Sequence, residues 1–526
     1  MAVTESIAGG APAEVRAVHE GILRRQSARE SSARTYARAL PIVPVRARGL
    51  TIEGADGRRY LDCLSGAGTL ALGHNHPVVL EAIRGVLDSG APLSVLDLAT
   101  PVKDAFVTEL FHTLPPGLAD RGRVQFCGPA GTDAVEAALT LVRAATGRSG
   151  ILAFTGAYHG MTAGALAASG GARDIQVTRL PYPQDYRCPF GVGGPTGAEL
   201  SARWTESLLD DPKSGVPLPA GMILEPVQGE GGVIPAPDDW LRRMRRFTAE
   251  RSVPLIADEV QTGVGRTGAF WAVDHSGIAP DVMVLSKAIG GSLPLAVIVY
   301  RDDLDVWQPG AHAGTFRGNQ LAMAAGTATL AYVRENALAE RAAALGSRML
   351  EQLAELTRHF PCVGDVRGRG LMIGLELVNP DADPVASRTT PPLDHPDAVP
   401  VAPGPTRTPH PAAPELAAAV QRECLRRGLI VELGGRHASV VRLLPPLTIS
   451  DEQANAVLDR LTDAVAAAAR DQQAHGPHQQ AEGPHQQAEG PHHQAEDPHH
   501  QAPGPNHQHA HRPHQQHDPG SARRKG

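Results

Sequence analysis

The sequence predicts an α/β protein: a large domain with a mostly parallel sheet sandwiched by helices, and a smaller α+β domain. The chain has 526 residues, 42% of them hydrophobic, and is therefore long enough to bury a large core. From about residue 75 to 335, short apolar segments alternate with helical stretches, which is typical of βαβ units. The 56 glycines and 45 prolines follow no collagen-like period, so we expect them in loops and tails.

Residues 1–74 are predicted to be an N-terminal segment that contributes to the small domain. Apolar residues at helical spacing among many charges predict a polar helix within 1–36. From residue 41 the pattern alternates as in short strands, with a turn at Asp56-Gly57.

Residues 75–336 are predicted to form the large domain. A strand at 123–128 precedes a helix at 132–146, for which Thr132 is a candidate N-cap. Four more buried strands are expected in the apolar segments 150–156, 221–227, 254–260 and 281–290.

Residues 337–470 are predicted to form the C-terminal small domain. It starts with a helix at 337–357, continues as strands from 363 to 377 and closes with a helix at 451–469. Eleven prolines between 380 and 414, with few large apolar side chains, predict an extended and poorly ordered insert.

A repetitive tail follows, from residue 471 to 526. Its unit GPHQQAE carries a proline in each copy, which forbids a continuous helix, and offers no large apolar side chain to bury. We therefore expect a disordered His/Pro/Gln-rich tail. Twelve of the 23 histidines lie in it, so weak binding of divalent metal is one hypothesis for its role. A repeat expansion without any role is the alternative.

Composition excludes several classes of protein. A net charge of −7 argues against a nucleic-acid binder. No apolar run approaches the ~20 residues that span a bilayer, and the N-terminus has no apolar signal-peptide region. The five cysteines are scattered without CxxC spacing, which indicates a reduced, cytoplasmic protein.

Lys287 is one of only four lysines among 49 basic residues. It follows an apolar strand and precedes a Gly-Gly turn, where a buried lysine amine can form an imine with an aldehyde. The alternative is a structural lysine whose ammonium reaches out of a strand end to solvent.

Asp258 favours the catalytic interpretation of Lys287. It ends a predicted strand 29 residues before the lysine, as one βαβ crossover would place it. Pyridoxal 5'-phosphate (PLP) needs a lysine for its aldehyde and a carboxylate that keeps its ring nitrogen protonated. Helix capping or an ion pair is the alternative role for Asp258.

A phosphate site is expected at a glycine-rich helix start. Gly128, Gly131 and Thr132 precede or open the helix at 132–146, and backbone N–H groups at a helix N-terminus attract anions. Tyr158 follows the next strand and could stack on a cofactor ring, although an ordinary packed aromatic is an equal alternative.

Seven motifs, in order between about residues 41 and 465, resemble those of the class III, fold-type I PLP-dependent aminotransferases. They are CGPAGTDAVEAAL, AYHGMT, LEPVQGEGG, ADEVQTGVGRTG, LSKAIGG, GTFRGNQLAMAAG and VRLLPPLTIS. The resemblance implies that Lys287 holds the cofactor and that Asp258 pairs with its ring nitrogen. It also implies Gln261 at the ring hydroxyl, Tyr158 on the ring, and Gly131 and Thr132 at the phosphate. Thr315 would join the phosphate site from the partner subunit of an obligate homodimer.

The same resemblance implies a two-substrate pocket. Arg442 matches the family arginine that binds the α-carboxylate of glutamate and 2-oxoglutarate, and a guanidinium fits a carboxylate at two points. Glu230 matches the acid that pairs with this arginine when the bound amine has no such carboxylate. A surface arginine is the alternative for Arg442.

Met161 bears on the amine substrate. Ornithine, acetylornithine and 4-aminobutyrate aminotransferases usually carry arginine at this position, after His-Gly. The pattern HGMT and three further stretches resemble the diaminobutyrate aminotransferases instead: 61–83, 96–111 and 422–450. This implies transfer of the terminal amino group between L-2,4-diaminobutyrate and 2-oxoglutarate, giving L-aspartate 4-semialdehyde and L-glutamate. No metal is expected in the catalytic body.

Three alternatives stay open at this point. The chain could be another class III enzyme, of the ectoine-pathway diaminobutyrate, lysine or ornithine type. It could serve metal storage or delivery through its tail. It could also be a non-catalytic scaffold of the same fold, which the presence of Lys287 and Asp258 disfavours.

Overall fold

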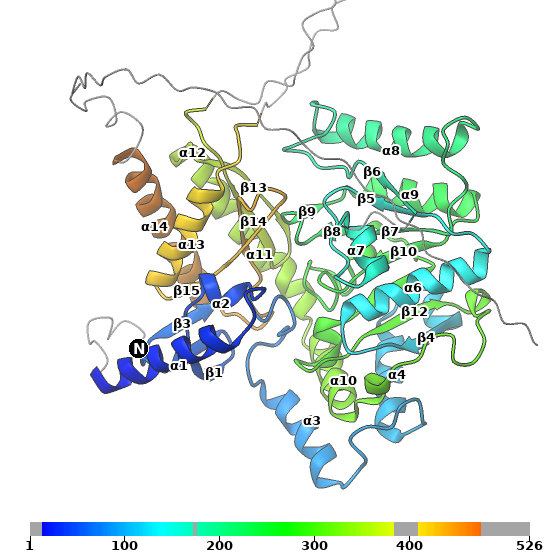
Figure 1. Cartoon of the computed structure of the whole chain (residues 1–526), viewed down its shortest axis with the longest axis horizontal. Coiled ribbons are helices and arrows are strands. Elements are labelled where there is room, and N and C mark those ends of the chain that lie inside the picture. The colour runs from blue at the N-terminus through cyan, green and yellow to red at the C-terminus, as the bar shows by residue number, and fades with distance from the viewer. Residues whose placement is uncertain (1–12, 172–175, 383–408, 475–526) are drawn as a thin grey trace, which may run out of the picture. The chain divides into compact units, whose positions relative to one another are not determined.

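The computed structural model describes residues 13–171, 176–382 and 409–474 (Figure 1). These described residues belong to one compact unit. The predictions of a disordered, metal-binding tail beyond residue 474 and of a poorly ordered segment within 383–408 lie outside the described residues.

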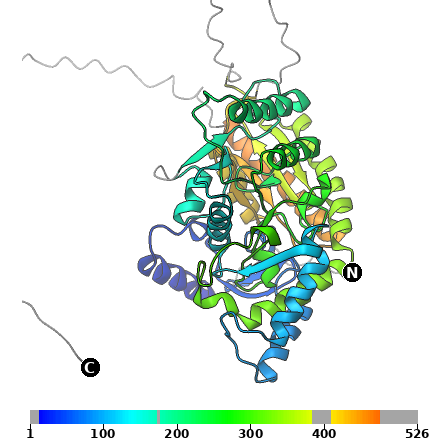
Figure 2. The same cartoon turned by 90° about the vertical axis from the view of Figure 1, so that its right-hand side faces the viewer.

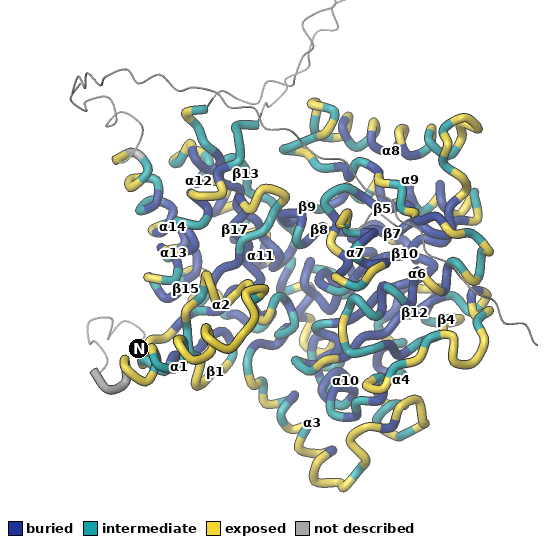
Figure 3. The backbone as a smooth tube through the Cα atoms, in the orientation of Figure 1, coloured by how far each residue is buried: buried dark blue, intermediate teal, exposed yellow. Residues whose placement is uncertain are grey.

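A seven-stranded sheet forms the centre of the fold. Its spatial order is β4 (Gly122–Phe126), β12 (Val297–Arg301), β11 (Val282–Leu285), β10 (Leu255–Asp258), β7 (Gly221–Leu224), β5 (Ile151–Phe154) and β6 (Val177–Leu180). All pairs are parallel except those of β12 with its two neighbours. Strands β5, β7, β10 and β11 are buried throughout, as Figure 3 shows, and this burial explains their continuous apolar runs.

Helices cover both faces of this sheet, which confirms the predicted α/β class. Ile256, Val282 and Val284 share one apolar core with helix α6 (Gly131–Thr146). The alternate residues Leu255 and Met283 belong to the other core, with helix α9 (Asp238–Glu250). Further helices of this half are α3 (Pro77–Asp88), α4 (Pro101–Thr113), α5 (Leu118–Arg121), α7 (Ala163–Ser169), α8 (Gly194–Asp210) and α10 (Gln320–Glu335). Helix α3 packs along α10 (Figures 1 and 2).

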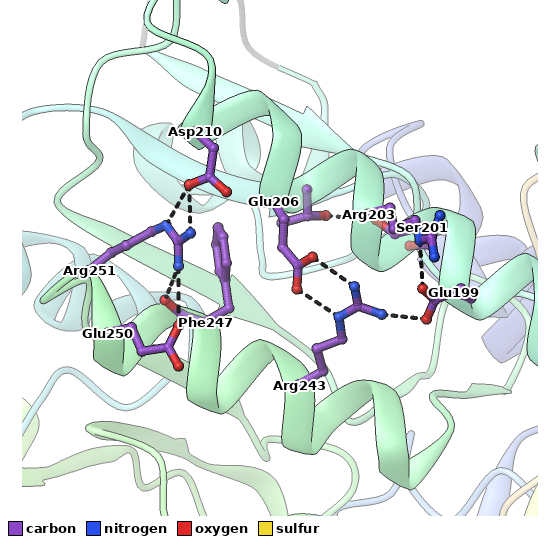
Figure 4. A network of polar contacts seen from close by, with 10 residues as sticks. Glu199, Ser201, Arg203, Glu206, Asp210, Arg243, Phe247, Glu250 and Arg251 are labelled. Atoms are coloured by element: carbon purple, nitrogen blue, oxygen red, sulfur yellow. Dashed lines mark hydrogen bonds and ion pairs between the residues drawn. The ribbon is translucent and has the colours of Figure 1, made fainter.

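Ion pairs join α8 to α9 beside the sheet (Figure 4). Arg243 of α9 makes a two-point contact with Glu206 of α8, at 2.6 and 2.7 Å, and also pairs with Glu199. Arg251, the residue directly after α9, pairs with Asp210, the last residue of α8, at 2.5 Å. These arginines therefore fix the two amphipathic helices to each other on their partly exposed sides.

Two local predictions need correction. Helix α6 begins at Gly131 and its N-cap is Ala130, because the Thr132 hydroxyl bonds to that of Thr162 at 2.7 Å. The connection from β10 to β11 contains only the short 3-10 turn η1 (Ala272–Ser276), where a βαβ crossover was expected. The other 3-10 turns are η2 (Lys287–Gly290), η3 (Asp302–Leu304) and η4 (Thr315–Gly318).

The N-terminal segment pairs with residues from far along the chain. Strands β1 (Pro44–Arg48), β2 (Thr51–Gly54) and β3 (Arg59–Asp62) form a sheet whose fourth strand is β15 (Leu429–Ile430), parallel to β3. Helices α1 (Ala13–Arg29) and α2 (Tyr36–Ala39) precede it and are largely exposed (Figure 3).

The C-terminal part of the chain forms an antiparallel four-stranded sheet. Its order is β13 (Val363–Arg369), β14 (Met372–Leu377), β17 (Val440–Leu443) and β16 (Glu432–Gly434). Its helices are α11 (Leu338–Ala354), α12 (Leu356–His359), α13 (Pro414–Arg426) and α14 (Asp451–Ala474). Helix α14 thus extends five residues past the predicted end at 469. A separate hairpin joins β8 (Val227–Gln228) to β9 (Ile234–Pro235).

The predicted loop at 380–414 is partly structured where it is described. Asn379 donates its N–H to the carbonyl of Pro411 at 2.9 Å, and Val378 forms a β-bridge with Ala412. Across the described ranges, no helix is long and apolar enough to cross a membrane.

We predict that Asp281 is a main electrostatic support of the central sheet. Its buried carboxylate accepts from Arg245 of α9 at 2.8 and 3.1 Å, from Arg301 of β12 at 2.6 Å and from the N–H of Leu255 at 2.8 Å. Asp281→Asn should lower the free energy of unfolding by about 3 kcal/mol, because both arginines lose a buried counter-charge. Urea denaturation measures the change. The control is Asp303→Asn, which removes an exposed partner of Arg301 and should cost less than about 1 kcal/mol. Equal losses would contradict the prediction.

Candidate active site

Asp258 and Lys287 lie at the same edge of the central sheet. Asp258 is the last residue of β10 and pairs in parallel register with Val284 of β11. Lys287 follows β11 after Ser286 and has a left-handed backbone, with φ of 51°. Because the carboxyl ends of parallel strands meet at one edge, the fold brings Asp258 and Lys287 to the same edge of the sheet.

A buried histidine holds the Asp258 carboxylate. Oδ2 of Asp258 lies 2.7 Å from Nδ1 of His159, and both residues are less than 5% exposed. Burial acts to lower the pKa of His159, but the hydrogen bond and charge of Asp258 outweigh it, so the pKa is raised. The other oxygen of Asp258 accepts the N–H of Val260 at 3.1 Å. Asp258 therefore has one fixed orientation.

Glu225 supports the loop that carries Tyr158. Its two carboxylate oxygens accept the backbone N–H groups of Tyr158 and Gly229, each at 2.9 Å. Burial raises the pKa of Glu225 to about 7. Sequence reasoning missed both Glu225 and His159, although each lies inside a quoted motif and His159 directly follows Tyr158. Tyr158 itself is 45% exposed, so its ring is open to solvent rather than packed in the core.

Gln261 presents a buried carbonyl oxygen to the same region. Its Nε2 donates to the carbonyl of Ala67 at 3.3 Å, while Oε1 has no partner among the described residues. Gly229 leaves room for this oxygen, because a Cβ at that position would lie 2.0 Å from it. A polar ligand group would satisfy Gln261 Oε1.

The N-terminus of α6 faces the loop after β10. A Cβ on Gly131 would lie 3.1 Å from Val260 Cγ1, so glycine allows this close approach. The loop that carries Thr315 is near, since a Cβ on Gly314 would lie 3.6 Å from the backbone nitrogen of Gly128. Thr315 is exposed, whereas the Thr132 hydroxyl is already bonded to Thr162.

Arg442 is fully buried and lies between two carboxylates. Its Nη2 is 2.9 and 2.8 Å from the two oxygens of Glu230, and 2.7 Å from Oε2 of Glu432. Nε and Nη1 are buried without a hydrogen-bond partner in the described structure. Glu432 stands directly opposite Arg442 in the pairing of β16 with β17, so the sheet register fixes this contact.

Glu432 and Tyr36 were missed by sequence reasoning. The Tyr36 hydroxyl donates to Oε1 of Glu432 at 2.8 Å, across 396 positions of sequence. Burial raises the pKa of Glu432, and Arg442 opposes that rise. Burial also raises the pKa of the Tyr36 hydroxyl, and the nearby negative charge of Glu432 raises it further. Nothing in the spacing of these residues could have revealed their contact.

Charges from both the group around Asp258 and the group around Arg442 act on Lys287. Burial lowers the pKa of its ammonium, while Glu230, Asp258 and Glu432 oppose that shift. A lowered pKa favours the neutral amine, which is the nucleophilic and proton-accepting form. Met161 is 66% exposed in the loop after His159 and adds no charge there.

The residues present fit PLP. Lys287 provides an amine for the aldehyde, and the oriented Asp258 provides an anion for the ring nitrogen. The N–H groups at the start of α6 suit a phosphate, and Gln261 Oε1 is a buried acceptor still lacking a donor. In the described ranges, no three His, Cys, Asp or Glu side chains come together as a metal site.

A separate cavity of about 830 Å³ lies between α8, α9 and the β13–β14 hairpin. It is lined by arginines and carboxylates in equal number, and none of the residues described above in this site contributes to it. The chemistry of Lys287 and Asp258 therefore lies elsewhere, and we place the active site with them.

Comparisons with known proteins show the family of this chain. The family model for class-III aminotransferases matches residues 32–465. A diaminobutyrate–2-oxoglutarate aminotransferase of Rhizobium meliloti (strain 1021) is 53% identical over 464 residues, which is 87% of this chain and 94% of that protein. One of Haemophilus influenzae is 44% identical and covers 86% of this chain and 97% of its own.

Solved structures show the same fold. A PLP-bound amine transaminase from an uncultivated Pseudomonas species has a TM-score of 0.69 and 29% identity, over 84% of this chain and 98% of its own. An (S)-enantioselective omega-transaminase from Thermomicrobium roseum has a TM-score of 0.72 and 25% identity, and the match covers 85% of this chain and 98% of that protein.

We predict that Lys287 is the lysine that binds the cofactor. Lys287→Ala should abolish amino transfer and the visible absorbance of the bound cofactor, because the amine at the sheet edge is lost. Borohydride reduction followed by peptide mapping should label Lys287 in the unmodified protein. Lys103 and Lys213 are the internal controls, since Lys103 Nζ donates to the Asp97 carbonyl at 2.9 Å and Lys213 is exposed. Label on either of these would contradict the assignment.

Proposed function

This chain belongs to the class-III aminotransferases, whose cofactor is PLP, and we propose that it moves the terminal amino group between L-2,4-diaminobutyrate and 2-oxoglutarate. The products are L-aspartate 4-semialdehyde and L-glutamate, and the reaction is reversible. The pairing of buried Arg442 with Glu230 carries the proposal, because it provides one pocket for two substrates of different charge. The names of the relatives and the neutral Met161 support diaminobutyrate as the amine.

Each site residue has a role in this proposal. When bound, the cofactor supplies an electron sink that stabilises negative charge on the substrate carbon. Lys287 holds the cofactor and, once free, takes the proton from the amine-bearing carbon of the substrate. Asp258, fixed by His159, keeps the ring nitrogen protonated. Tyr158 covers the ring, and Gln261 meets the ring hydroxyl.

Arg442 and Glu230 serve the two half-reactions differently. With glutamate or 2-oxoglutarate, Arg442 binds the α-carboxylate and Glu230 moves away. With diaminobutyrate, whose reacting carbon bears no carboxylate, Glu230 stays on Arg442 and neutralises it. The 33% exposed side chain of Glu230 supports this exchange, because it has solvent to move into.

The phosphate site comprises Gly131 and Thr132, with Thr315 supplied by a partner subunit. An exposed apolar surface supports a homodimer at this place. Leu93, Leu96, Leu98 and Phe316 are each at least 50% exposed, on two loops joined by the bridge between Ser94 and Asn319. Exposed apolar surface of this kind marks a site of protein association.

We also propose the domain division and location predicted from sequence. Residues 75–336 are the cofactor domain, and 1–74 join 337–470 in the small domain, which the pairing of β3 with β15 supports. The enzyme is cytoplasmic in this proposal, which the free state of all five cysteines supports.

A donor assay tests the proposal. The purified enzyme with 2-oxoglutarate should form glutamate fastest from L-2,4-diaminobutyrate, and more slowly from L-ornithine, L-lysine and 4-aminobutyrate. L-aspartate 4-semialdehyde should appear in equal amount. A preference for ornithine or lysine would replace the proposed substrate while leaving the family unchanged.

We predict that Arg442→Lys impairs the 2-oxoglutarate half-reaction more than the diaminobutyrate half-reaction. Lysine keeps the charge but loses the two-point contact with a carboxylate, which costs about tenfold to a hundredfold in kcat/KM. Single-turnover kinetics of each half-reaction measure the difference. Equal loss in both would contradict the exchange of partners at Arg442.

A further inference from the structure

Two carboxylates surround the single positive charge of Arg442, which is one more than that charge requires. Glu230 already contacts the guanidinium with both oxygens, at 2.9 and 2.8 Å. Glu432 adds a second negative charge at 2.7 Å, in a side chain that is only 8% exposed. Burying an extra anion is costly unless a further positive group meets it.

Oxygen Oε2 of Glu432 is a buried acceptor to which no described hydrogen-bond donor is directed. It contacts Arg442 Nη2 as an ion pair but makes no directed hydrogen bond among the described residues. Oε1 is held by the Tyr36 hydroxyl at 2.8 Å, so the carboxylate cannot rotate freely. An ionised carboxylate accepts about four hydrogen bonds, and those found here leave acceptor positions unused.

Glu432 also lies beside the arginine of the proposed substrate pocket, 2.7 Å from Arg442 Nη2. Its charge acts on Lys287 as well as on Arg442, and the sheet register fixes it opposite Arg442. An ammonium group at the far end of a substrate whose terminal amine reaches Lys287 would therefore meet Glu432. L-2,4-diaminobutyrate has such a group, because its α-ammonium is separated from the transferred amine by three carbons.

We propose that Glu432, oriented by Tyr36, selects the amine donor by accepting the α-ammonium group of a diamino acid. This inference rests on the proposed function. Glutamate has no second amine, so Glu432 has no such partner in that half-reaction and serves only as a counter-charge to Arg442.

Two donor analogues separate the parts of the substrate. 4-Aminobutyrate is diaminobutyrate without its α-ammonium, and 1,3-diaminopropane is diaminobutyrate without its carboxylate. Glu432→Gln keeps the shape and the Tyr36 contact but removes the charge. It should lower kcat/KM about tenfold to a hundredfold for diaminobutyrate and for 1,3-diaminopropane. The value for 4-aminobutyrate should change less than about threefold.

Tyr36→Phe removes the hydroxyl that orients Glu432. It should lower kcat/KM for the two diamines by a smaller factor than Glu432→Gln does. The kcat/KM for 4-aminobutyrate should stay unchanged. The matched control is Glu376→Gln, which removes a buried carboxylate from β14 that pairs with Arg187 and Arg367 instead. In Glu376→Gln, the ratio of kcat/KM for diaminobutyrate to kcat/KM for 4-aminobutyrate should equal the wild-type ratio.

The half-reactions distinguish recognition from a structural role. In Glu432→Gln, the single-turnover rate with glutamate should fall by a smaller factor than the rate with diaminobutyrate, because Glu432 serves glutamate only as a counter-charge to Arg442. Equal loss with all donors and with glutamate would show that Glu432 only neutralises Arg442, and would overturn this inference. Failure of the wild-type enzyme to use diaminobutyrate would instead overturn the proposed function, and is seen before any variant is made.

Discussion

The site depends on the parallel register of β10 and β11. Both strands are buried along their whole length, with Ile256, Val282 and Val284 in one core and Leu255 and Met283 in the other. A slip of one residue would turn each apolar face toward the opposite core, so the register is strongly held. The carboxyl ends of the strands then deliver Asp258 and Lys287 to one edge. The left-handed backbone at Lys287 costs about 1 kcal/mol or more, and the surrounding packing sustains it.

Burial in this site sets the chemical state of each group. It lowers the pKa of Lys287 and raises that of Glu225 to about 7, because both groups lose hydration of their charged forms. At His159 the hydrogen bond and charge of Asp258 outweigh burial, so the raised pKa of this histidine favours an imidazolium beside the carboxylate. The same low-dielectric surroundings thus favour the neutral amine of Lys287, while His159 orients the carboxylate of Asp258.

The sequence predicted the fold and the residues that carry local signals. Lys287 and Asp258 were chosen as candidates because Lys287 follows an apolar segment and Asp258 ends one, and such changes in hydropathy are visible in the sequence. Glu432 and Tyr36 were not found, because their contact depends on β15 and β16 approaching the N-terminal segment, and no local pattern encodes that approach. Thr132 was mistaken for a cap because its hydroxyl prefers Thr162, a partner that only the fold brings near.

The two carboxylates on Arg442 differ in their freedom to move, and this difference fits a pocket that serves two substrates. Glu230 lies in the loop after β8 with 33% of its side chain exposed, whereas Glu432 is 8% exposed and held by a strand and by Tyr36. If both carboxylates left, Arg442 would be a buried, unpaired charge each time the substrate departed, at a cost of several kcal/mol. If neither left, an incoming carboxylate would find no free donor except Nε and Nη1. In the proposed reaction, a fixed Glu432 therefore keeps Arg442 paired while Glu230 exchanges with the substrate.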